Sequence, residues 1–375
     1  MTPPRALVPI FLGSLLALAG CRGGSPLILG LSVALTGPTS DLGIACRDAV
    51  ALAVEEANAQ GGIKGRPITL VLRDDQGDPD RAVDADRALW VMGARVIIGQ
   101  VTSATLPRVL AWAKDHDLLI VSPSASATSF GVDRTNLVRF TESNALQSRR
   151  LARVALADGR RKVLAVIDSS NGDYSEDFAG IFAATLGDAG GTLSATIRFR
   201  SESLLDSAAR IEAEAGRADC DSALIVASAV DTGILAQFLR KVKPGLALYS
   251  SGWAFSRALL SSGGSAIEGL TLTQGFNYDD PDPAYRSFRD SYERRFGRPV
   301  DYEALFSYEA AQAVIDACRR APDFSAASVK SALLDPRNAV GLGRKFRLDA
   351  NGDITRTGYI YRVRDGAFAP AGIGQ

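Results

Sequence analysis

Two polar loops carry the side chains with the clearest chemistry in this sequence. The predicted strand at residues 95–99 is followed by residues 100–103 (QVTS), directly before a predicted helix. The predicted strand at residues 118–121 is followed by residues 122–128 (SPSASAT). The carboxyl ends of parallel strands meet at one edge of a sheet, so we expect the two loops to lie together. Hydroxyl groups and free backbone N–H groups at a helix N-terminus can hold a carboxylate without Lys or Arg.

The same loops also allow a simpler interpretation as caps and turns. Ser103 is well placed to cap the helix that follows it, and serines are common in turns. Either loop alone favours that interpretation. Their occurrence on neighbouring strands favours a ligand site, in which Ser103, Ser124 and Ser126 contact the ligand.

Composition and missing motifs argue against catalysis, metal binding and nucleic-acid binding. The chain has 375 residues, 42 Lys and Arg against 42 Asp and Glu, and a single histidine, His116. One histidine rules out multi-histidine metal sites and argues against a catalytic triad. A neutral chain without a basic excess argues against nucleic acid as a partner. Phosphate-loop, dinucleotide-binding and G-x-S-x-G motifs are also absent, so we expect a protein that is not an enzyme and holds no cofactor or metal.

The order of predicted strands and helices repeats once along the chain. Helices are expected between short apolar runs that predict buried strands, at residues 28–34, 68–72, 95–99 and 118–121. A second series begins with a strand at residues 163–167, roughly 130 residues later, a spacing typical of one domain each. This alternation predicts an α/β fold of two doubly wound, Rossmann-like lobes, with the default ligand site in the cleft between them.

The last third of the chain does not form a third domain. It contains predicted helices at residues 285–296 and 304–319 and predicted strands at residues 340–348 and 357–364. These elements must complete the two earlier lobes, so the chain crosses between them more than once through a multi-strand hinge. We assign residues 27–144 and 275–335 to lobe 1, and residues 145–274 and 336–375 to lobe 2.

The N-terminal residues have the features of a bacterial export signal. Arg5 precedes an apolar stretch at residues 7–19, shorter than the about 20 residues needed to cross a bilayer. Residues 18–21 (LAGC) resemble a lipobox, which implies cleavage before Cys21 and lipid attachment to its sulfur. We therefore expect residues 1–20 to be a lipoprotein signal peptide and Cys21 to anchor the protein in the periplasm or on the cell surface. The alternative is an ordinary signal peptide with a chance cysteine.

Four segments, in this order, resemble the leucine/isoleucine/valine-binding protein family. They are residues 35–38 (LTGP), 57–65 (ANAQGGIKG), 74–79 (DDQGDP) and 122–126 (SPSAS). The resemblance extends from about residue 27 to residue 361. The family comprises the solute receptors of branched-chain amino-acid ABC importers. The resemblance therefore implies a periplasmic binding protein fold of type I, a small-molecule ligand, and permease subunits in the inner membrane as partners.

The resemblance also implies roles for individual residues. In that family a serine after the third strand, and a backbone amide and hydroxyl in the next loop, hold the ligand carboxylate. Ser103, Ser124 and Ser126 match these positions. An aromatic residue after the first strand of the second domain covers the ligand, and Tyr174 matches it.

Other positions depart from the family pattern. Leu42 stands where the family has an aromatic side chain. The acidic residue with which the family holds the ligand ammonium falls near Gly252-Trp253, where this sequence has no carboxylate. Trp253 could stack on an apolar ligand body or pack at the hinge. Asp231, which could instead cap a helix, and Glu303 are alternative ammonium partners.

We therefore expect a lipid-anchored solute-binding protein of an ABC importer. Its ligand would be an amino acid or a related organic acid with a carboxylate. The alternative is a sensor of the same fold that reports to a signalling partner. Adjacent permease and ATPase genes would favour the importer.

Overall fold

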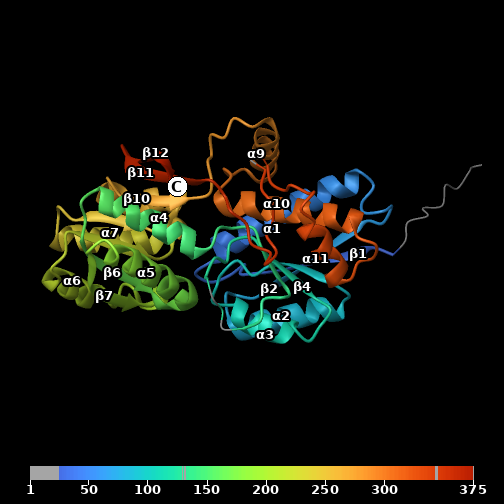
Figure 1. Ribbon diagram of the computed structural model, residues 1–375, viewed down its shortest axis with the longest axis horizontal. Helices are drawn as coiled ribbons and strands as arrows, with labels where there is room; N and C mark the ends of the chain where they lie inside the picture. Colours follow the sequence, from blue (N-terminus) through green and yellow to red (C-terminus); the bar gives the residue numbers. More distant parts are fainter. Residues whose placement is uncertain (1–24, 129, 131, 343–344, 375) are drawn as a thin grey trace, which may run out of the picture.

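The computed structural model describes residues 25–374 apart from residues 129, 131 and 343–344. The predicted signal peptide and Cys21 lie outside the described residues. Two α/β lobes lie side by side along the longest axis of the molecule (Figure 1). Each lobe holds one sheet of mostly parallel strands, so the predicted fold class is confirmed.

Lobe 1 is built on five parallel strands in the order β2-β1-β3-β4-β5. The strands are β1 (Leu27–Val33), β2 (Ile68–Asp74), β3 (Val96–Gly99), β4 (Leu119–Ser122) and β5 (Leu137–Arg139). The described helices that accompany them are α1 (Ser40–Ala59), α2 (Pro79–Val91), α3 (Leu106–Ala113), α9 (Pro283–Phe296), α10 (Tyr302–Arg320) and α11 (Ala326–Leu334). Helix α10 packs along α1, while α2 and α3 cover the opposite face of the sheet (Figure 1).

Lobe 2 is built on seven strands in the order β12-β11-β10-β9-β8-β6-β7. Among the described strands of this sheet, β10, β11 and β12 pair antiparallel in that order, and the other pairs are parallel. The strands are β6 (Lys162–Asp168), β7 (Thr192–Phe199), β8 (Ser222–Val226), β9 (Ala247–Ser250), β10 (Thr271–Gln274), β11 (Gly358–Arg364) and β12 (Ala367–Gly374). The helices are α4 (Asn144–Ala157), α5 (Gly172–Gly187), α6 (Ala208–Arg217), α7 (Ala229–Val242) and α8 (Arg257–Gly263). Short 3₁₀ turns cover Ser169–Asn171, Ser201–Ser203, Gly252–Ala254 and Gly264–Ile267.

The described chain passes between the lobes after β5, after β10 and before β11. Strands β11 and β12 extend the sheet of lobe 2. Asp353, however, accepts hydrogen bonds from two arginines of lobe 1. Arg134 lies shortly before β5, and Arg139 is the last residue of β5. This contact favours a boundary closer to Gly358 than to residue 336.

The expected strand at residues 340–348 is wrong. Only an isolated bridge joins Val340 to Phe346, and neither residue pairs with a sheet. Val340, Leu342 and Phe346 are instead partly buried side chains that pack against the core. Their spacing led to the prediction of a strand, because a loop that covers a core also places apolar residues at intervals.

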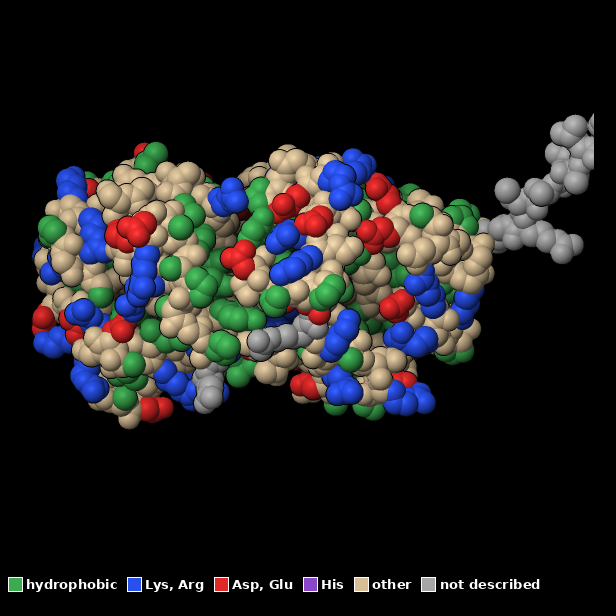
Figure 2. All heavy atoms as spheres, turned by 90° about the horizontal axis from the view of Figure 1, so that it is seen from above, with side chains coloured by type: hydrophobic (Ala, Val, Ile, Leu, Met, Phe, Trp, Pro, Cys, Tyr) green, Lys and Arg blue, Asp and Glu red, His purple; other side chains and the backbone are tan. Residues whose placement is uncertain are grey.

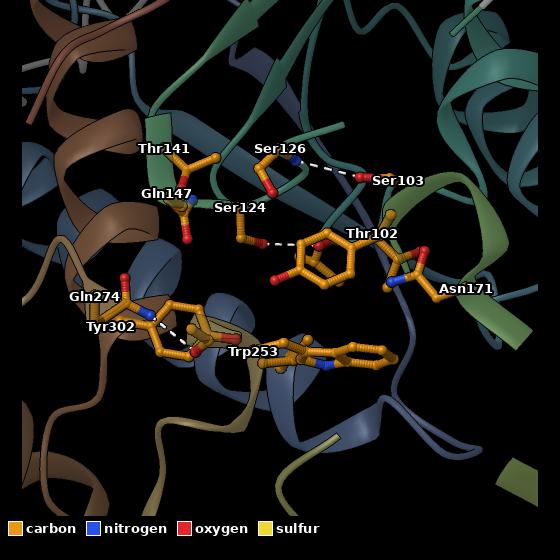
Figure 3. A pocket seen from close by; sticks show the side chains of 14 residues that line it. Thr102, Ser103, Ser124, Ser126, Thr141, Gln147, Asn171, Trp253, Gln274 and Tyr302 are labelled. Atoms are coloured by element: carbon orange, nitrogen blue, oxygen red, sulfur yellow. Dashed lines mark hydrogen bonds between the residues drawn. The ribbon is translucent and has the colours of Figure 1, made fainter. Parts of the chain in front are cut away.

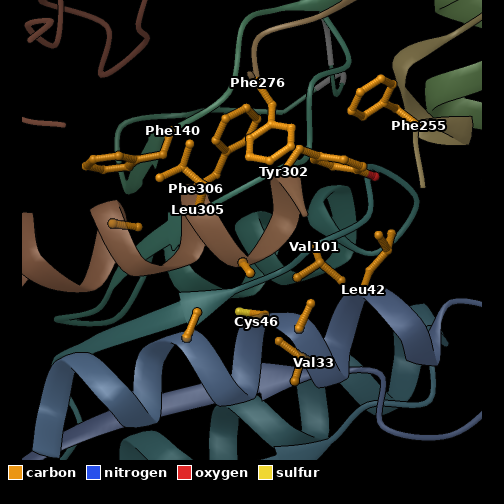
Figure 4. Packing of buried hydrophobic residues seen from close by; sticks show 14 of the residues in the cluster. Val33, Leu42, Cys46, Val101, Phe140, Phe255, Phe276, Tyr302, Leu305 and Phe306 are labelled. Atoms are coloured by element: carbon orange, nitrogen blue, oxygen red, sulfur yellow. The ribbon is translucent and has the colours of Figure 1, made fainter. Parts of the chain in front are cut away.

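The core between α1 and α10 fixes the direction in which α10 meets the cleft. Cys46 of α1 lies between the two helices, and Leu305 and Phe306 of α10 extend the same cluster (Figure 4). Phe306 is fully buried, and its ring centroid lies 5.9 Å from that of Tyr302. Because the buried turn of α10 cannot rotate without losing this packing, Tyr302 is held at the cleft.

One face of the molecule and the described helices can be compared with the expectations from composition. Lys, Arg, Asp and Glu side chains are mixed over the face in Figure 2 without a patch of one sign. Among the described residues, every helix is too short or too polar to cross a bilayer.

Candidate functional site

A pocket lies between the lobes, where the carboxyl ends of strands from both sheets meet (Figure 3). Its walls come from the loops after β3, β4, β6 and β9, from the first residues of α1 and α10, and from residues beside the hinge. The lining residues are Leu42, Val101, Thr102, Ser103, Ser124, Ser126, Thr141, Gln147, Asn171, Tyr174, Gly252, Trp253, Gln274 and Tyr302. The structure thus brings together six residues singled out in the sequence: Leu42, Ser103, Ser124, Ser126, Tyr174 and Trp253.

Ser103 joins the two serine-bearing loops of lobe 1. Its Oγ accepts the backbone N–H groups of Ser126 and Ala127, each at 3.2 Å. A hydroxyl has two acceptor lone pairs and one proton, so the proton of Ser103 remains available to a ligand. The expected capping role is wrong, because α3 begins at Leu106 and Thr105 occupies the N-cap position.

Ser124 and Ser126 donate their protons within the protein. Ser124 Oγ donates to the carbonyl oxygen of Val101 at 2.8 Å, and Ser126 Oγ donates to Asn144 Oδ1 at 2.8 Å. Asn144 in turn donates through Nδ2 to the backbone oxygen of Tyr174 at 3.0 Å. Asn144 therefore links the serine loop of lobe 1 to the start of α5 in lobe 2.

Aromatic side chains form the wall opposite the serines. The rings of Tyr174 and Trp253 meet edge to face, with centroids 5.5 Å apart and an interplanar angle of 80°. Burial raises the pKa of the Tyr174 hydroxyl. Tyr174 therefore stays neutral at physiological pH, and with Tyr302 it offers an apolar surface to a ligand body.

Hydrogen bonds between the lobes close the pocket. Asn171 Oδ1 accepts the backbone N–H of Ala104 at 3.1 Å, and Asp177 Oδ2 accepts the backbone N–H and the hydroxyl of Thr128 at 2.9 and 3.0 Å. The cavity volume left between the lobes is about 30 Å³. A buried water occupies roughly 10–15 Å³ on this measure, so entry of a larger ligand requires the lobes to move apart.

Asp231 and Glu303, the two alternative ammonium partners, do not line the pocket. Asp231 accepts a hydrogen bond from Ser201 Oγ at 2.6 Å, and Ser228 is the residue that caps α7. Glu303 is fully buried behind the pocket, where Oε1 accepts a hydrogen bond from Ser307 at 3.0 Å. Burial raises the pKa of Glu303 to about 8, while the hydrogen bond from Ser307 opposes that rise.

Comparison with known proteins decides the family. The sequence model of a family described as "Periplasmic binding protein" matches residues 26–367. The chain belongs to the periplasmic binding protein family. Members of this family bind ligands and are not enzymes. The predicted resemblance and the expectation of a non-catalytic protein are therefore confirmed.

Individual relatives match this periplasmic binding protein over different lengths. A "Leu/Ile/Val-binding protein BraC3" from Rhizobium johnstonii is 33% identical over 166 residues, which is 44% of either chain. The chain thus matches less than half the length of that relative. A "Leu/Ile/Val-binding protein homolog 1" from Brucella suis is 24% identical over 375 residues, covering 96% of either chain. The solved structure of a leucine-binding protein from Thermotoga maritima superposes with a TM-score of 0.84 at 22% identity, covering 93% of this chain and 99% of that chain.

Several pocket residues of this periplasmic binding protein escaped the sequence analysis. Thr141, Gln147 and Gln274 lie beside the chain crossings, and Tyr302 opens α10. No local motif marks them, because their place in the pocket depends on how the two lobes meet. Asn171 immediately precedes α5, and a helix N-terminus is a place where an anionic ligand can bind, so its position gave a local signal.

The pocket of this periplasmic binding protein is polar but uncharged. None of the described residues that line it carries a formal charge at neutral pH. Within the described ranges, no group of His, Cys, Asp and Glu side chains could hold a metal ion. The groups that this pocket presents are therefore hydroxyls, amides, helix termini and aromatic side chains.

Proposed function

We propose that this protein is an extracytoplasmic solute-binding lipoprotein of an ABC importer. It binds a small ligand with a carboxylate, an amino acid or a related organic acid, in the cleft between its lobes. The observation that carries this proposal is the convergence of Ser103, Ser124 and Ser126 on one uncharged interlobe pocket. Closure of the lobes over the ligand would produce the form that the permease recognises.

The names of related proteins support this ligand class. Curated relatives are named Leu/Ile/Val-binding proteins. A solved solute-binding protein from R. palustris, in complex with benzoate, superposes on this chain with a TM-score of 0.77 at 19% identity. Leucine and benzoate share a carboxylate and an apolar body, the two features that the serine loops and the aromatic wall fit.

Export and lipid anchoring complete the proposal. Residues 1–20 would direct the chain across the inner membrane, and acyl chains on Cys21 would hold it in the periplasm or on the cell surface. From there it would deliver ligand to permease subunits in the inner membrane.

A comparison of acids with their amides tests the carboxylate. A bound ligand raises the melting temperature by mass action. We expect 4-methylpentanoate, 3-phenylpropanoate or benzoate to raise the melting temperature of the mature protein, and the matching carboxamide to raise it much less. Equal shifts for an acid and its amide would show that the carboxylate is not recognised.

A further inference from the structure

The pocket offers a ligand no opposite charge for an ammonium group. The position near Gly252-Trp253, at the start of the turn after β9, supplies an indole and a backbone oxygen but no carboxylate. Among the described lining residues the polar side chains are all hydroxyls or amides. A buried ammonium without an anionic partner loses its hydration and regains little.

The helices that begin at the pocket favour an anion over a cation. Asn171 lines the pocket and directly precedes α5, and Asn144, the first residue of α4, holds Ser126. Ser103 lies just before α3. The N-terminus of a helix carries partial positive charge and unpaired N–H groups, which attract a carboxylate and repel an ammonium group.

Three amide oxygens at the pocket already accept a hydrogen bond within the protein. Asn171 Oδ1 accepts from Ala104, the Gly252 carbonyl accepts from Gln274 Nε2 at 3.0 Å, and Gln274 Oε1 accepts from Gly275 at 2.7 Å. Gln147 donates through Nε2 to the Glu142 carbonyl at 2.8 Å, which turns its Oε1 toward Gly252. The remaining amide and hydroxyl oxygens carry no charge, so they cannot offset the desolvation of an ammonium group as a carboxylate would.

The acidic residues beside Leu42 and Tyr302 in the sequence do not line the pocket. Asp41 is exposed on the first turn of α1, next to the lining residue Leu42. Asp301 accepts the backbone N–H of Ala304 at 2.8 Å as the cap of α10, and Glu303 is buried behind Tyr302. None of the three reaches the cavity surface in the closed arrangement.

We infer that the site selects carboxylates that lack an α-ammonium group. This inference rests on the proposed function and narrows its ligand class. The ligand would be an organic acid with an aromatic or branched apolar body, and the matching α-amino acid would bind more weakly.

Matched pairs of probes test this selection. L-Leucine and 4-methylpentanoate differ only in the ammonium group, as do L-phenylalanine and 3-phenylpropanoate. One of the two pairs should have an apolar group that fits the pocket. In that pair, calorimetric titration of the mature protein at pH 7 should show that the acid binds at least tenfold more tightly than the amino acid. Equal or tighter binding of the amino acid would overturn the inference while the proposed function stands. If neither acid nor amino acid binds in either pair, both fail.

A matched pair of variants tests the cause. Trp253→Glu introduces a carboxylate at the place where an ammonium partner is missing. Trp253→Gln is the control, because glutamine has the size of glutamate but no charge. The affinity ratio of amino acid to acid should rise at least tenfold in Trp253→Glu compared with Trp253→Gln. An identical ratio in the two variants would show that the missing charge does not set the selection.

Discussion

Ser103 Oγ accepts the backbone N–H of Ser126 at 3.2 Å and so joins the loops after β3 and β4. A second bond at 3.2 Å, from the backbone N–H of Ala127, completes the acceptor capacity of the hydroxyl. The same side chain therefore shapes the site and retains one proton for the ligand. Its removal should affect both properties.

Ser103→Ala should destabilise the protein modestly and weaken ligand binding. The substitution leaves two buried N–H groups without their acceptor, which costs about 1–3 kcal/mol of unfolding free energy. Loss of a hydrogen bond to a carboxylate should also reduce affinity by about tenfold or more. Urea unfolding and calorimetric titration measure the two effects. Ser331→Ala, on the exposed face of α11, is the control and should leave both unchanged.

Asp177→Ala should weaken binding although Asp177 does not line the pocket. Asp177 holds Thr128 across the cleft through two hydrogen bonds. Without these bonds, the equilibrium between the closed and the open form of the protein shifts toward the open form. The apparent affinity for ligand falls with the fraction of closed protein, by about two- to tenfold. Small-angle scattering without ligand should show a larger radius of gyration than for Asp188→Ala, an exposed control at the end of the same helix. Unchanged affinity and scattering would show that this contact does not hold the lobes closed.

Glu303 should make the protein less stable as pH rises. Its pKa is raised by burial from 4.5 to about 8, so the folded state binds more protons than the unfolded state between these values. The contribution is fully present below pH 4.5 and is lost as pH rises to about 8, by an amount on the order of a few kcal/mol. Burial likewise raises the pKa of Asp86 to about 7 and of Asp301 to about 6, so both act in the same direction.

The variant Glu303→Gln separates the contribution of Glu303 to the pH dependence of stability from those of Asp86 and Asp301. The amide does not titrate, so the loss of stability between pH 5 and pH 9 should be smaller in the variant, and at pH 9 the variant should be the more stable protein. Urea unfolding at pH 5, 7 and 9 measures this. The same pH dependence in both proteins would contradict the prediction.

Arg139 should stabilise the fold through hydrogen bonds that also hold the loop after β4. Its guanidinium, on a side chain only 1% exposed, donates to both carboxylate oxygens of Asp353 and to the carbonyl of Ala127 at 2.7 Å. Arg139→Leu removes all three bonds and should cost a few kcal/mol, because Asp353 and Ala127 lose a buried partner. In a double-mutant cycle, Arg139→Leu should cost less when Asp353 is already leucine. Strict additivity would show that the pair contributes nothing.

Cys21 should carry the lipid. Cys21→Ser should abolish metabolic labelling with a fatty acid and release the protein from the membrane fraction, because the thioether cannot form. Cys46→Ser is the control, since Cys46 is buried in lobe 1 and should not change labelling. Labelling that persists in Cys21→Ser would refute the anchor.

The strands of the fold were predictable because they are buried on both faces. Strands β1, β3, β4, β6 and β8 are short apolar runs bounded by glycine or polar residues, and a parallel strand needs no other signal. Strand β5 has three residues and β10 reads Thr-Leu-Thr-Gln, so neither has an apolar pattern of its own. Their position depends on neighbouring strands that only the folded sheet supplies.

Part of the site was predictable for a related reason. Ser103, Ser124 and Ser126 follow two adjacent parallel strands, so sheet topology alone brings them to one pocket. Gln147, Gln274 and Thr141 reach the pocket only through the packing of one lobe against the other. Glu303 resembled a ligand partner in sequence, but the helical turn that presents Tyr302 to the cleft turns Glu303 into the core.

The central claim is that the serine loops hold the carboxylate of a ligand in the interlobe pocket. Its most direct test is calorimetric titration of the mature protein and of Ser103→Ala/Ser126→Ala with the acid that gives the largest thermal shift. The account predicts saturable binding without turnover in the native protein, and at least a tenfold loss of affinity in a double variant that remains folded. The same affinity in both proteins would contradict it.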